Sequence, residues 1–251
     1  MIILISEVFS SIMGEGKFIG RRYIFIRFKG CPLNCIYCDE YTKNDMPCRV
    51  EEVSGSGIFK EYINTAENNN LIEIINKIKT PDLFAISFTG GEPLLYADKI
   101  KEYSDILNDL GHKTHLESNG MFPDKINYFD YSSIDIKLKE HFDFNNFNSK
   151  KYDELYNNEL KSIEKLYNLG SDVYGKVVIM ENTTPETVEQ VAKDLSDIGD
   201  DIILCIQPVS PFKDIKSPSQ QNLLKIMEVC GNHLGDSVIC TSQIHKYLGM
   251  L

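Results

Sequence analysis

The chain is organised around one stretch, Arg27-Phe28-Lys29-Gly30-Cys31-Pro32-Leu33-Asn34-Cys35-Ile36-Tyr37-Cys38, which holds three of its seven cysteines. Their C-x3-C-x2-C spacing lets three thiolates meet at one metal centre, and thiolates select zinc, copper or an iron–sulfur cluster. Structural zinc sites need four ligands, usually as spaced pairs, and catalytic zinc sites usually include histidine. The other cysteines stand singly, and the nearest histidine is His112. The stretch therefore favours a [4Fe–4S] cluster with one open iron, with zinc as the alternative.

Predicted strands and helices alternate around this cysteine loop. Residues 23–28, rich in β-branched and aromatic side chains, form a strand that leads directly into it. Further strands are predicted over 83–88, 113–117, 133–136, 174–180 and 202–207. Helices are predicted over 71–78, 94–110, about 150–168, 184–197 and 217–230, the last two opening at Thr184-Pro185 and Ser217-Pro218. Repeated βα units imply parallel strands, and six strands suit an incomplete (β/α)6 TIM-like barrel, with a doubly wound open sheet as the alternative.

The composition suits a single soluble domain over residues 1–251. It is 42% hydrophobic and 25% charged, and 37 acidic against 26 basic residues give a net charge of −11. That charge disfavours nucleic acid as a partner and favours a small molecule. Without a signal peptide or a membrane-spanning stretch, a cytoplasmic location is expected. Glycine, serine and asparagine runs predict an insertion at about 43–70, in which Cys48 is either unliganded or an additional ligand.

Polar residues follow the predicted strands, where barrel enzymes place their active sites. Arg27 ends the first strand and needs an anionic partner or a route to solvent. The later strand ends are followed by Thr89-Gly90-Gly91-Glu92-Pro93, Glu117-Ser118-Asn119-Gly120, Asp135-Ile136-Lys137 and Gln207-Pro208-Val209-Ser210. Each of these also suits an ordinary turn or a salt-bridged strand end. Their shared position at successive strand tips favours a functional site.

Two motifs together resemble the signature of radical S-adenosylmethionine (SAM) enzymes: the cysteine motif with Tyr37 before its third cysteine, and the downstream Gly90-Gly91-Glu92-Pro93. The resemblance implies that Cys31, Cys35 and Cys38 hold a [4Fe–4S] cluster whose open iron binds the amino and carboxylate groups of SAM. Reductive cleavage of SAM then gives a 5′-deoxyadenosyl radical. Gly14-Glu15-Gly16 and Gln243-Ile244-His245-Lys246 are similar to one subfamily, the 7-carboxy-7-deazaguanine synthases, and matches extend over nearly the whole chain.

This resemblance implies a lyase that contracts the ring of 6-carboxy-5,6,7,8-tetrahydropterin to 7-carboxy-7-deazaguanine, with release of ammonia, in 7-deazapurine (queuosine or archaeosine) biosynthesis. The family's substrate contacts fall on Ile12, Met13, Gly14, Glu15, Arg27, Thr89 and His245. Its SAM contacts fall on Gly90, Gly91, Glu92, Glu117, Ser118, Asn119, Asp135, Lys137, Gln207, Pro208, Val209 and Ser210. The chemistry is carried by the cluster and SAM, so no residue is expected to act as general acid or base.

Two positions depart from the family pattern. Where the family has a Mg²⁺-binding Thr or Ser after the last cluster cysteine, this chain has Glu40, so Glu40 is the candidate Mg²⁺ ligand and Thr42 the second. The family's Ser-Pro-Lys turn is Asp135-Ile136-Lys137, of which the lysine carries over most directly. The family also implies a flavodoxin or ferredoxin-type electron donor and a homodimer. A glycyl-radical activating enzyme shares the cysteine motif and is the alternative, with a non-enzymatic metal-binding module as a more distant one.

Overall fold

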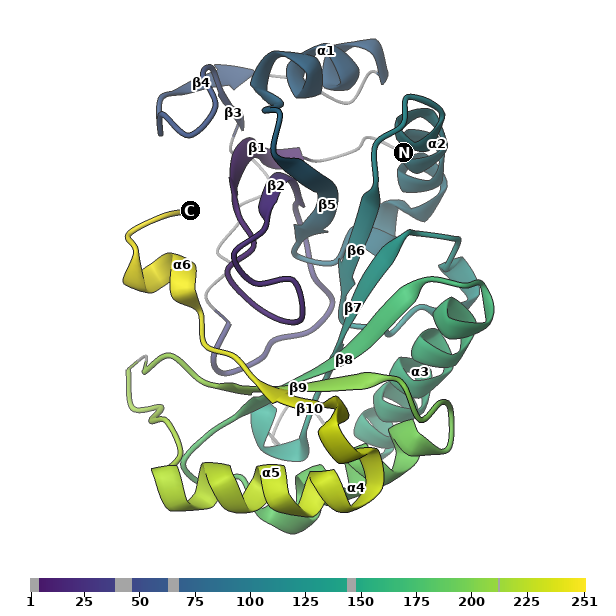
Figure 1. Cartoon of the computed structure of the whole chain (residues 1–251), viewed down its shortest axis with the longest axis vertical. Coiled ribbons are helices and arrows are strands. Elements are labelled where there is room, and N and C mark those ends of the chain that lie inside the picture. The colour runs from purple at the N-terminus through teal and green to yellow at the C-terminus, as the bar shows by residue number, and fades with distance from the viewer. Residues whose placement is uncertain (1–4, 39–46, 63–67, 144–147, 212) are drawn as a thin grey trace.

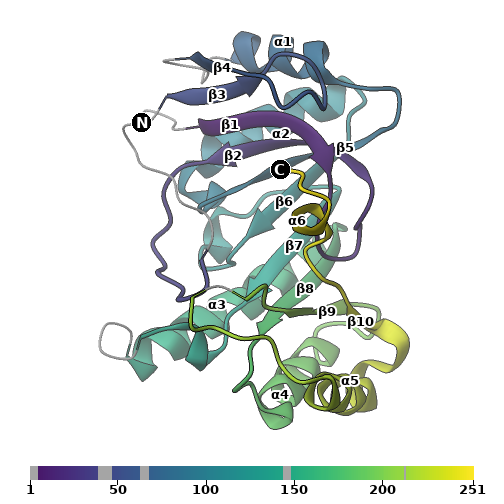
Figure 2. The same ribbon diagram turned by 90° about the vertical axis from the view of Figure 1, so that its left-hand side faces the viewer.

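The structure is a computed structural model that describes residues 5–38, 47–62, 68–143, 148–211 and 213–251. Its strands form one sheet in the order β10-β9-β8-β7-β6-β5-β2-β1-β3-β4 (Figures 1 and 2). Their bounds are β1 Ile5–Ile12, β2 Arg22–Phe28, β3 Cys48–Glu51, β4 Phe59–Tyr62, β5 Leu83–Gly90, β6 Thr114–Ser118, β7 Tyr131–Ile136, β8 Asp172–Ile179, β9 Ile203–Pro208 and β10 Val238–Cys240.

The six predicted strands are confirmed as parallel neighbours, β2, β5, β6, β7, β8 and β9, with β10 parallel beyond β9. The sheet curves into an incomplete barrel. Helices α2, α3, α4 and α5 lie along its convex side, and α6 with the C-terminal residues crosses the concave side (Figures 1 and 2). The α-helices are α1 Asn68–Ile78, α2 Ala97–Asp109, α3 Ser149–Asn168, α4 Pro185–Ser196, α5 Gln220–Leu234 and α6 Ile244–Tyr247. Short 3-10 helices are η1 Pro93–Tyr96, η2 Pro123–Lys125, η3 Lys139–His141 and η4 Gly235–Ser237.

Three local predictions need correction. The last long helix does not open at Ser217-Pro218; it begins at Gln220, with the Ser219 side chain accepting from the N–H of Asn222. The predicted helix over 94–110 is divided into η1 and α2. The strand predicted over 202–207 extends one residue further, since Pro208 still lies opposite Ile179.

Strand β1 is absent from the sequence prediction. It pairs antiparallel with β2 and parallel with β3, so it is buried between two neighbours. Six of its eight residues are fully buried, including serines, so the alternation of apolar and polar residues that marks a one-sided strand is missing. β1 matters for the site because the Gly14-Glu15-Gly16 loop follows directly from its end.

The predicted insertion contains β3 and β4, which extend the sheet beyond β1. Its last residues begin helix α1. Cys48 is buried at the start of β3 in the main hydrophobic core, with Val50 and Ile75. The limits of the insertion stay a prediction, because residues 39–46 and 63–67 lie outside the described residues.

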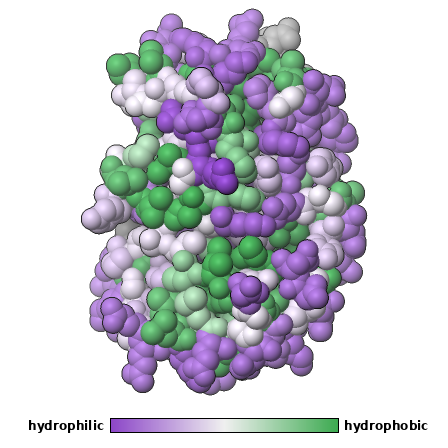
Figure 3. All heavy atoms as spheres, viewed as in Figure 1, coloured by the Kyte–Doolittle hydropathy of each residue, from purple (hydrophilic) through white to green (hydrophobic). Residues whose placement is uncertain are grey.

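Side-chain alternation along the strands separates the core from the concave side. In β2, Ile24, Ile26 and Phe28 belong to the main hydrophobic core, whereas Phe25 and Arg27 line the concave cavity. On the face shown in Figure 3, hydrophilic side chains lie mainly around the edges and hydrophobic ones gather over the middle. Within the described residues, no helix is both long and apolar enough to cross a bilayer.

Candidate active site

A cavity of about 550 Å³ opens at the carboxyl ends of the parallel strands. Its walls come from the strand ends, the cysteine loop, the loop after β1 and the C-terminal segment. Within β8 the lining residues alternate, Lys176 and Val178, whereas at the end of β6 the consecutive residues Glu117, Ser118 and Asn119 all line the cavity. This is the mouth at which barrel enzymes bind their ligands.

The cysteine loop forms one wall of the cavity. Cys31, Cys35 and Cys38 all line it. The N–H of Ile36 donates to the carbonyl of His141 at 3.0 Å, and the Tyr37 ring packs edge-on against the His141 ring at 4.8 Å. The loop is therefore fixed to the turn between β7 and α3.

His141 supports this turn as a neutral imidazole. Its Nε2 bonds to the carbonyl of Val178 at 2.8 Å, and its Nδ1 accepts from the N–H of Leu138 at 2.9 Å. That pairing assigns the proton to Nε2. Burial lowers the pKa of His141 to about 3, so the ring stays uncharged at neutral pH.

A set of three thiols suits an iron–sulfur cluster, whose irons are held by cysteine thiolates. Among the described residues, no three His, Cys, Asp or Glu side chains converge closely enough to hold one metal ion. Thiolates that each bind a different iron of a cluster need no such convergence. Burial raises the pKa of the Cys35 thiol to about 11, and nearby Lys137 opposes the rise, so metal binding must release protons from this wall.

The Gly90-Gly91 loop packs backbone to backbone against the start of the cysteine loop. A Cβ on Gly91 would lie 2.1 Å from the carbonyl oxygen of Gly30, and one on Gly90 would lie 2.5 Å from the Phe28 main chain. The N–H of Gly91 donates to Phe28 at 2.8 Å, and that of Glu92 donates to Gly30 at 2.7 Å. These two N–H groups are therefore used within the protein, which holds the Gly90-Gly91 loop against the start of the cysteine loop.

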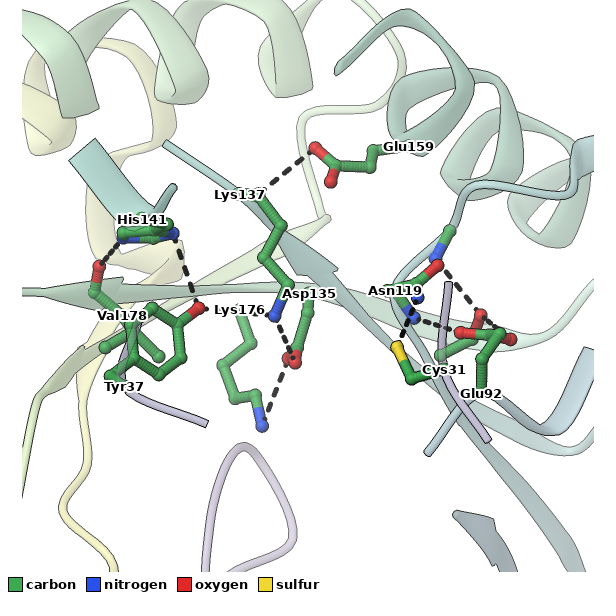
Figure 4. Close-up of polar contacts among 12 residues, drawn as sticks. Cys31, Tyr37, Glu92, Asn119, Asp135, Lys137, His141, Glu159, Lys176 and Val178 are labelled. Atoms are coloured by element: carbon green, nitrogen blue, oxygen red, sulfur yellow. Dashed lines mark hydrogen bonds and ion pairs between the residues drawn. The ribbon is translucent and has the colours of Figure 1, made fainter. Parts of the chain in front are cut away.

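Glu92 lies behind the cavity wall and is not among the lining residues. Its Oε1 accepts from the N–H of Leu94 at 2.9 Å and from Ser118 Oγ at 2.8 Å, and its Oε2 accepts from the N–H of Asn119 at 2.9 Å. Burial raises the pKa of Glu92 to about 7. Asn119 Nδ2 in turn lies 3.6 Å from Cys31 Sγ (Figure 4). Glu92 thus positions the loop that carries Asn119.

A row of charged side chains crosses the cavity (Figure 4). Lys176 Nζ contacts Glu15 Oε2 at 2.6 Å and Asp135 Oδ1 at 3.1 Å. Lys137 Nζ donates to Asp135 Oδ2 at 2.9 Å and to Tyr37 Oη at 3.3 Å. Burial opposes the ionisation of Asp135, but Lys137 and Lys176 outweigh it and lower the pKa to about 2. Burial also opposes ionisation of Glu15, but Lys176 and Gln243 lower its pKa, so both carboxylates are ionised acceptors.

The C-terminal segment closes the cavity over the Gly14-Glu15-Gly16 loop. The N–H of Ile244 donates to the carbonyl of Gly14 at 3.0 Å, and Gln243 Nε2 donates to Glu15 Oε1 at 2.6 Å. A Cβ on Gly14 would lie only 1.8 Å from His245 Nδ1, so glycine is required for this contact. The two sequence motifs of the subfamily, at opposite ends of the chain, form one wall.

Two further charged groups line the cavity. Arg27 is paired with Glu7 at 2.9 Å, and its guanidinium group lies 4.8 Å from the centre of the Phe9 ring. Glu7 is the anionic partner that the sequence required. Glu117 accepts from Ser87 Oγ at 2.5 Å, and burial raises the pKa of its carboxyl to about 7.

The structure brings almost all of the predicted residues to this one cavity. Those that line it are Ile12, Met13, Gly14, Glu15, Arg27, Thr89, Gly90, Gly91, Glu117, Ser118, Asn119, Asp135, Lys137, Gln207, Val209, Ser210 and His245, with the three cysteines. Pro208, like Glu92, is not among the lining residues. Glu40 and Thr42 lie outside the described residues.

Sequence reasoning missed Lys176 and assigned no site role to Tyr37 or Gln243, although both stand in the quoted motifs. Lys176 carried a detectable signal, since it is the one charge within the apolar run Val173–Ile179 and needs a partner for the same reason as Arg27. Gln207 adds a ligand-directed acceptor: its buried Oε1 has no hydrogen-bond partner among the described residues.

Comparisons with known proteins agree with this geometry. A model of the radical SAM superfamily matches residues 25–195. The chain is 62% identical to a 7-carboxy-7-deazaguanine synthase of Methanocaldococcus jannaschii, over 99% of this chain and 100% of that protein. It is 38% identical to the synthase of Methanothermobacter thermautotrophicus, over 98% and 97% of the two chains.

Solved structures share the fold at low sequence identity. The crystal structure of QueE from Escherichia coli aligns with a TM-score of 0.59 and 19% identity, covering 96% of this chain and 93% of that one. A radical SAM methyltransferase from Sphaerobacter thermophilus aligns with a TM-score of 0.58 and 13% identity, covering 88% and 66%. Both support the incomplete barrel.

Proposed function

The chain belongs to the radical SAM superfamily and, within it, to the 7-carboxy-7-deazaguanine synthases, and we propose that its cavity binds 6-carboxy-5,6,7,8-tetrahydropterin beside SAM and forms 7-carboxy-7-deazaguanine with release of ammonia. One observation carries the proposal. The three cysteines and the Gly14-Glu15-Gly16 loop with its His245 partner, which are far apart in the sequence, line the same cavity.

The pterin side of the cavity is formed by Glu15, Arg27 and His245. Burial opposes ionisation of Glu15, but Lys176 and Gln243 lower its pKa, so it accepts hydrogen bonds from the amino and ring N–H groups of a pterin. The guanidinium group of Arg27 has five N–H donors and uses one nitrogen on Glu7, which leaves donors for the substrate carboxylate.

The SAM side adjoins the cysteine loop. The carbonyl oxygens of Gly90 and Gly91 suit the amino group of SAM, Lys137 suits its carboxylate, and Gln207 supplies a further acceptor. The cluster held by Cys31, Cys35 and Cys38 would supply one-electron reduction of SAM and hence the adenosyl radical that takes a hydrogen from the substrate. The protein's part is to hold both ligands in register and to exclude water from the cavity.

Anaerobic turnover tests the proposal. Reconstituted protein is incubated with dithionite, SAM and 6-carboxytetrahydropterin, and the products are identified by mass spectrometry. We expect 7-carboxy-7-deazaguanine and ammonia. Accumulation of 5′-deoxyadenosine without that product would retain the SAM chemistry and remove the substrate assignment, as a glycyl-radical activating enzyme requires. Zinc without sulfide in the purified protein would instead support a non-enzymatic module.

Magnesium belongs to the proposal through Glu40, with Thr42 as the second candidate ligand. A carboxylate is a suitable Mg²⁺ ligand, and the substrate carboxylate would complete the site. Glu40→Ala should lower product formation and raise the Mg²⁺ concentration needed for half-maximal rate, with Thr42→Ala as the comparison. Equal Mg²⁺ dependence in all three proteins would remove both candidates.

A flavodoxin or ferredoxin-type protein is the proposed electron donor, and a homodimer the proposed assembly. Reduction of the cluster by a purified flavodoxin, followed by electron paramagnetic resonance, tests the first. Light scattering of the cluster-loaded protein tests the second, and a monomer at micromolar concentration would contradict it.

A further inference from the structure

Lys176 lines the cavity between the two sets of predicted ligand contacts. It lies in β8, is 8% exposed, and its ammonium group lies between two carboxylates, Glu15 at 2.6 Å and Asp135 at 3.1 Å. A buried ammonium group is tolerated only when it is paired and hydrogen-bonded. Lys176 meets that requirement by joining two elements that are distant in the chain, the loop after β1 and the end of β7.

The contacts continue on both sides of Lys176. On one side, the other oxygen of Asp135 accepts from Lys137, which reaches Tyr37 in the cysteine loop. On the other side, the second oxygen of Glu15 accepts from Gln243. A chain of polar contacts therefore runs from the cysteine loop to the C-terminal segment. Figure 4 shows its first part, from Tyr37 through Lys137 and Asp135 to Lys176.

This chain connects the two ligand sites of the proposed function, on which the inference rests. Asp135 and Lys137 belong to the SAM side, and Glu15 belongs to the pterin side. Each carboxylate uses one oxygen on Lys176 and the other on a separate donor. A pterin that binds first holds Glu15 in place, and SAM that binds first holds Asp135 in place. In either case Lys176, which contacts both carboxylates, then limits the positions open to the other one. The second ligand meets a site already ordered, which gives positive cooperativity.

We propose that Lys176 is a positioning residue that couples binding of the pterin at Glu15 to binding of SAM beside Asp135. Neither ligand needs to touch Lys176 for this coupling. Its removal leaves Glu15 with Gln243 and Asp135 with Lys137, so each site keeps a donor but the connection between the sites is lost.

Binding measurements test the coupling without turnover. The cluster-loaded protein is kept oxidised, without reductant, and titrated calorimetrically with SAM in the absence and presence of saturating 6-carboxytetrahydropterin, and then in the reverse order. In the wild type we expect each ligand to tighten the other about tenfold, by the same factor in both directions. In Lys176→Met the factor should fall to about one, while both ligands still bind.

Three further variants define the outcome. Lys176→Arg keeps a cation and should retain most of the coupling. Lys176→Gln keeps a hydrogen-bond donor without the charge. It is used in place of Lys176→Met if the Met variant does not retain its cluster. Lys17→Met removes the surface ion pair with Asp172 at the start of β8 and should leave the factor unchanged.

The possible results separate cleanly. A wild-type factor of one, or a factor retained in the uncharged Lys176 variants, overturns the inference. If a Lys176 variant binds SAM and the pterin equally more weakly but keeps the wild-type coupling factor, the role of Lys176 is purely structural, and the inference is overturned as well. If the wild type binds SAM but no pterin, the proposed function itself fails, and the wild-type titration alone shows this.

Discussion

Glu92 offers a direct contrast between a ligand-binding role and a structural one. The Gly-Gly-Glu-Pro motif predicts a SAM contact, but the structure places the carboxyl group behind the wall, where it accepts three hydrogen bonds from buried groups. Glu92→Ala leaves the N–H groups of Leu94 and Asn119 without a partner. Each unsatisfied buried donor costs about 1–3 kcal/mol, so the loss of partners for these two should lower the free energy of unfolding by about 2–6 kcal/mol. That is a large part of the stability of an ordinary domain.

Glu92→Gln is the matched control. Its carbonyl oxygen can still accept from Leu94 and Ser118, but its amide group then faces the N–H of Asn119, so one hydrogen bond is lost. We expect a decrease of about 1–2 kcal/mol. Urea unfolding of the cluster-free proteins, followed by circular dichroism at pH 5.5, measures both changes. At that pH the carboxyl, whose pKa burial raises to about 7, is protonated in the folded protein.

The loss of unfolding free energy in Glu92→Ala decides between a structural and a ligand-binding role for Glu92. If the free energy of unfolding of Glu92→Ala lies within about 1 kcal/mol of the wild-type value, the structural reasoning is refuted, because two buried donors without a partner should destabilise the protein by more than that. A loss of SAM affinity in Glu92→Gln with unchanged stability would instead restore the direct contact that the motif predicts. Equal m-values would show that the surface exposed on unfolding is unchanged.

Three other predictions follow from the site. Gly14→Ala places a methyl group 1.8 Å from His245 Nδ1, so the C-terminal segment must shift and turnover should fall by roughly 100-fold. Gly231→Ala is the control: open space surrounds that position, so turnover should be unchanged. Steady-state kinetics of both variants measures the difference. Burial raises the folded-state pKa of Glu117 to about 7, so its contribution to stability is complete below pH 4.5 and is lost, by about 3 kcal/mol, as the pH rises through 7. Urea unfolding across this range should therefore show a flatter pH dependence of the unfolding free energy in Glu117→Gln than in the wild type. The same slope in both proteins would contradict the pKa shift. Cys31→Ser should prevent cluster assembly, read as lost visible absorbance and lowered iron content after reconstitution, and full iron content would argue against Cys31 as a ligand.

The sequence by itself determined the parallel core of the barrel and the position of its active end. Short-range periodicity and turn residues are enough to locate strands β2 and β5 to β9, and parallel strands bring the residues after their carboxyl ends to one edge. The cysteine loop was equally readable, because its three ligands lie within eight residues and need no distant partner. Strand β1 escaped prediction because both of its faces are buried, which removes the alternation on which strand prediction depends.

Only the tertiary structure decided which of the polar residues act together. Glu15 meets Lys176 across 161 positions of the chain and Gln243 across 228, and no local pattern specifies either contact. Likewise, the Glu92 carboxyl group caps the adjoining η1 helix through the N–H of Leu94, but its bonds from Ser118 and Asn119 form only because β5 and β6 are neighbours in the sheet. The physical reason is that local propensity fixes the path of a segment, but the direction in which a side chain points and the distant residue it meets depend on how the whole sheet closes.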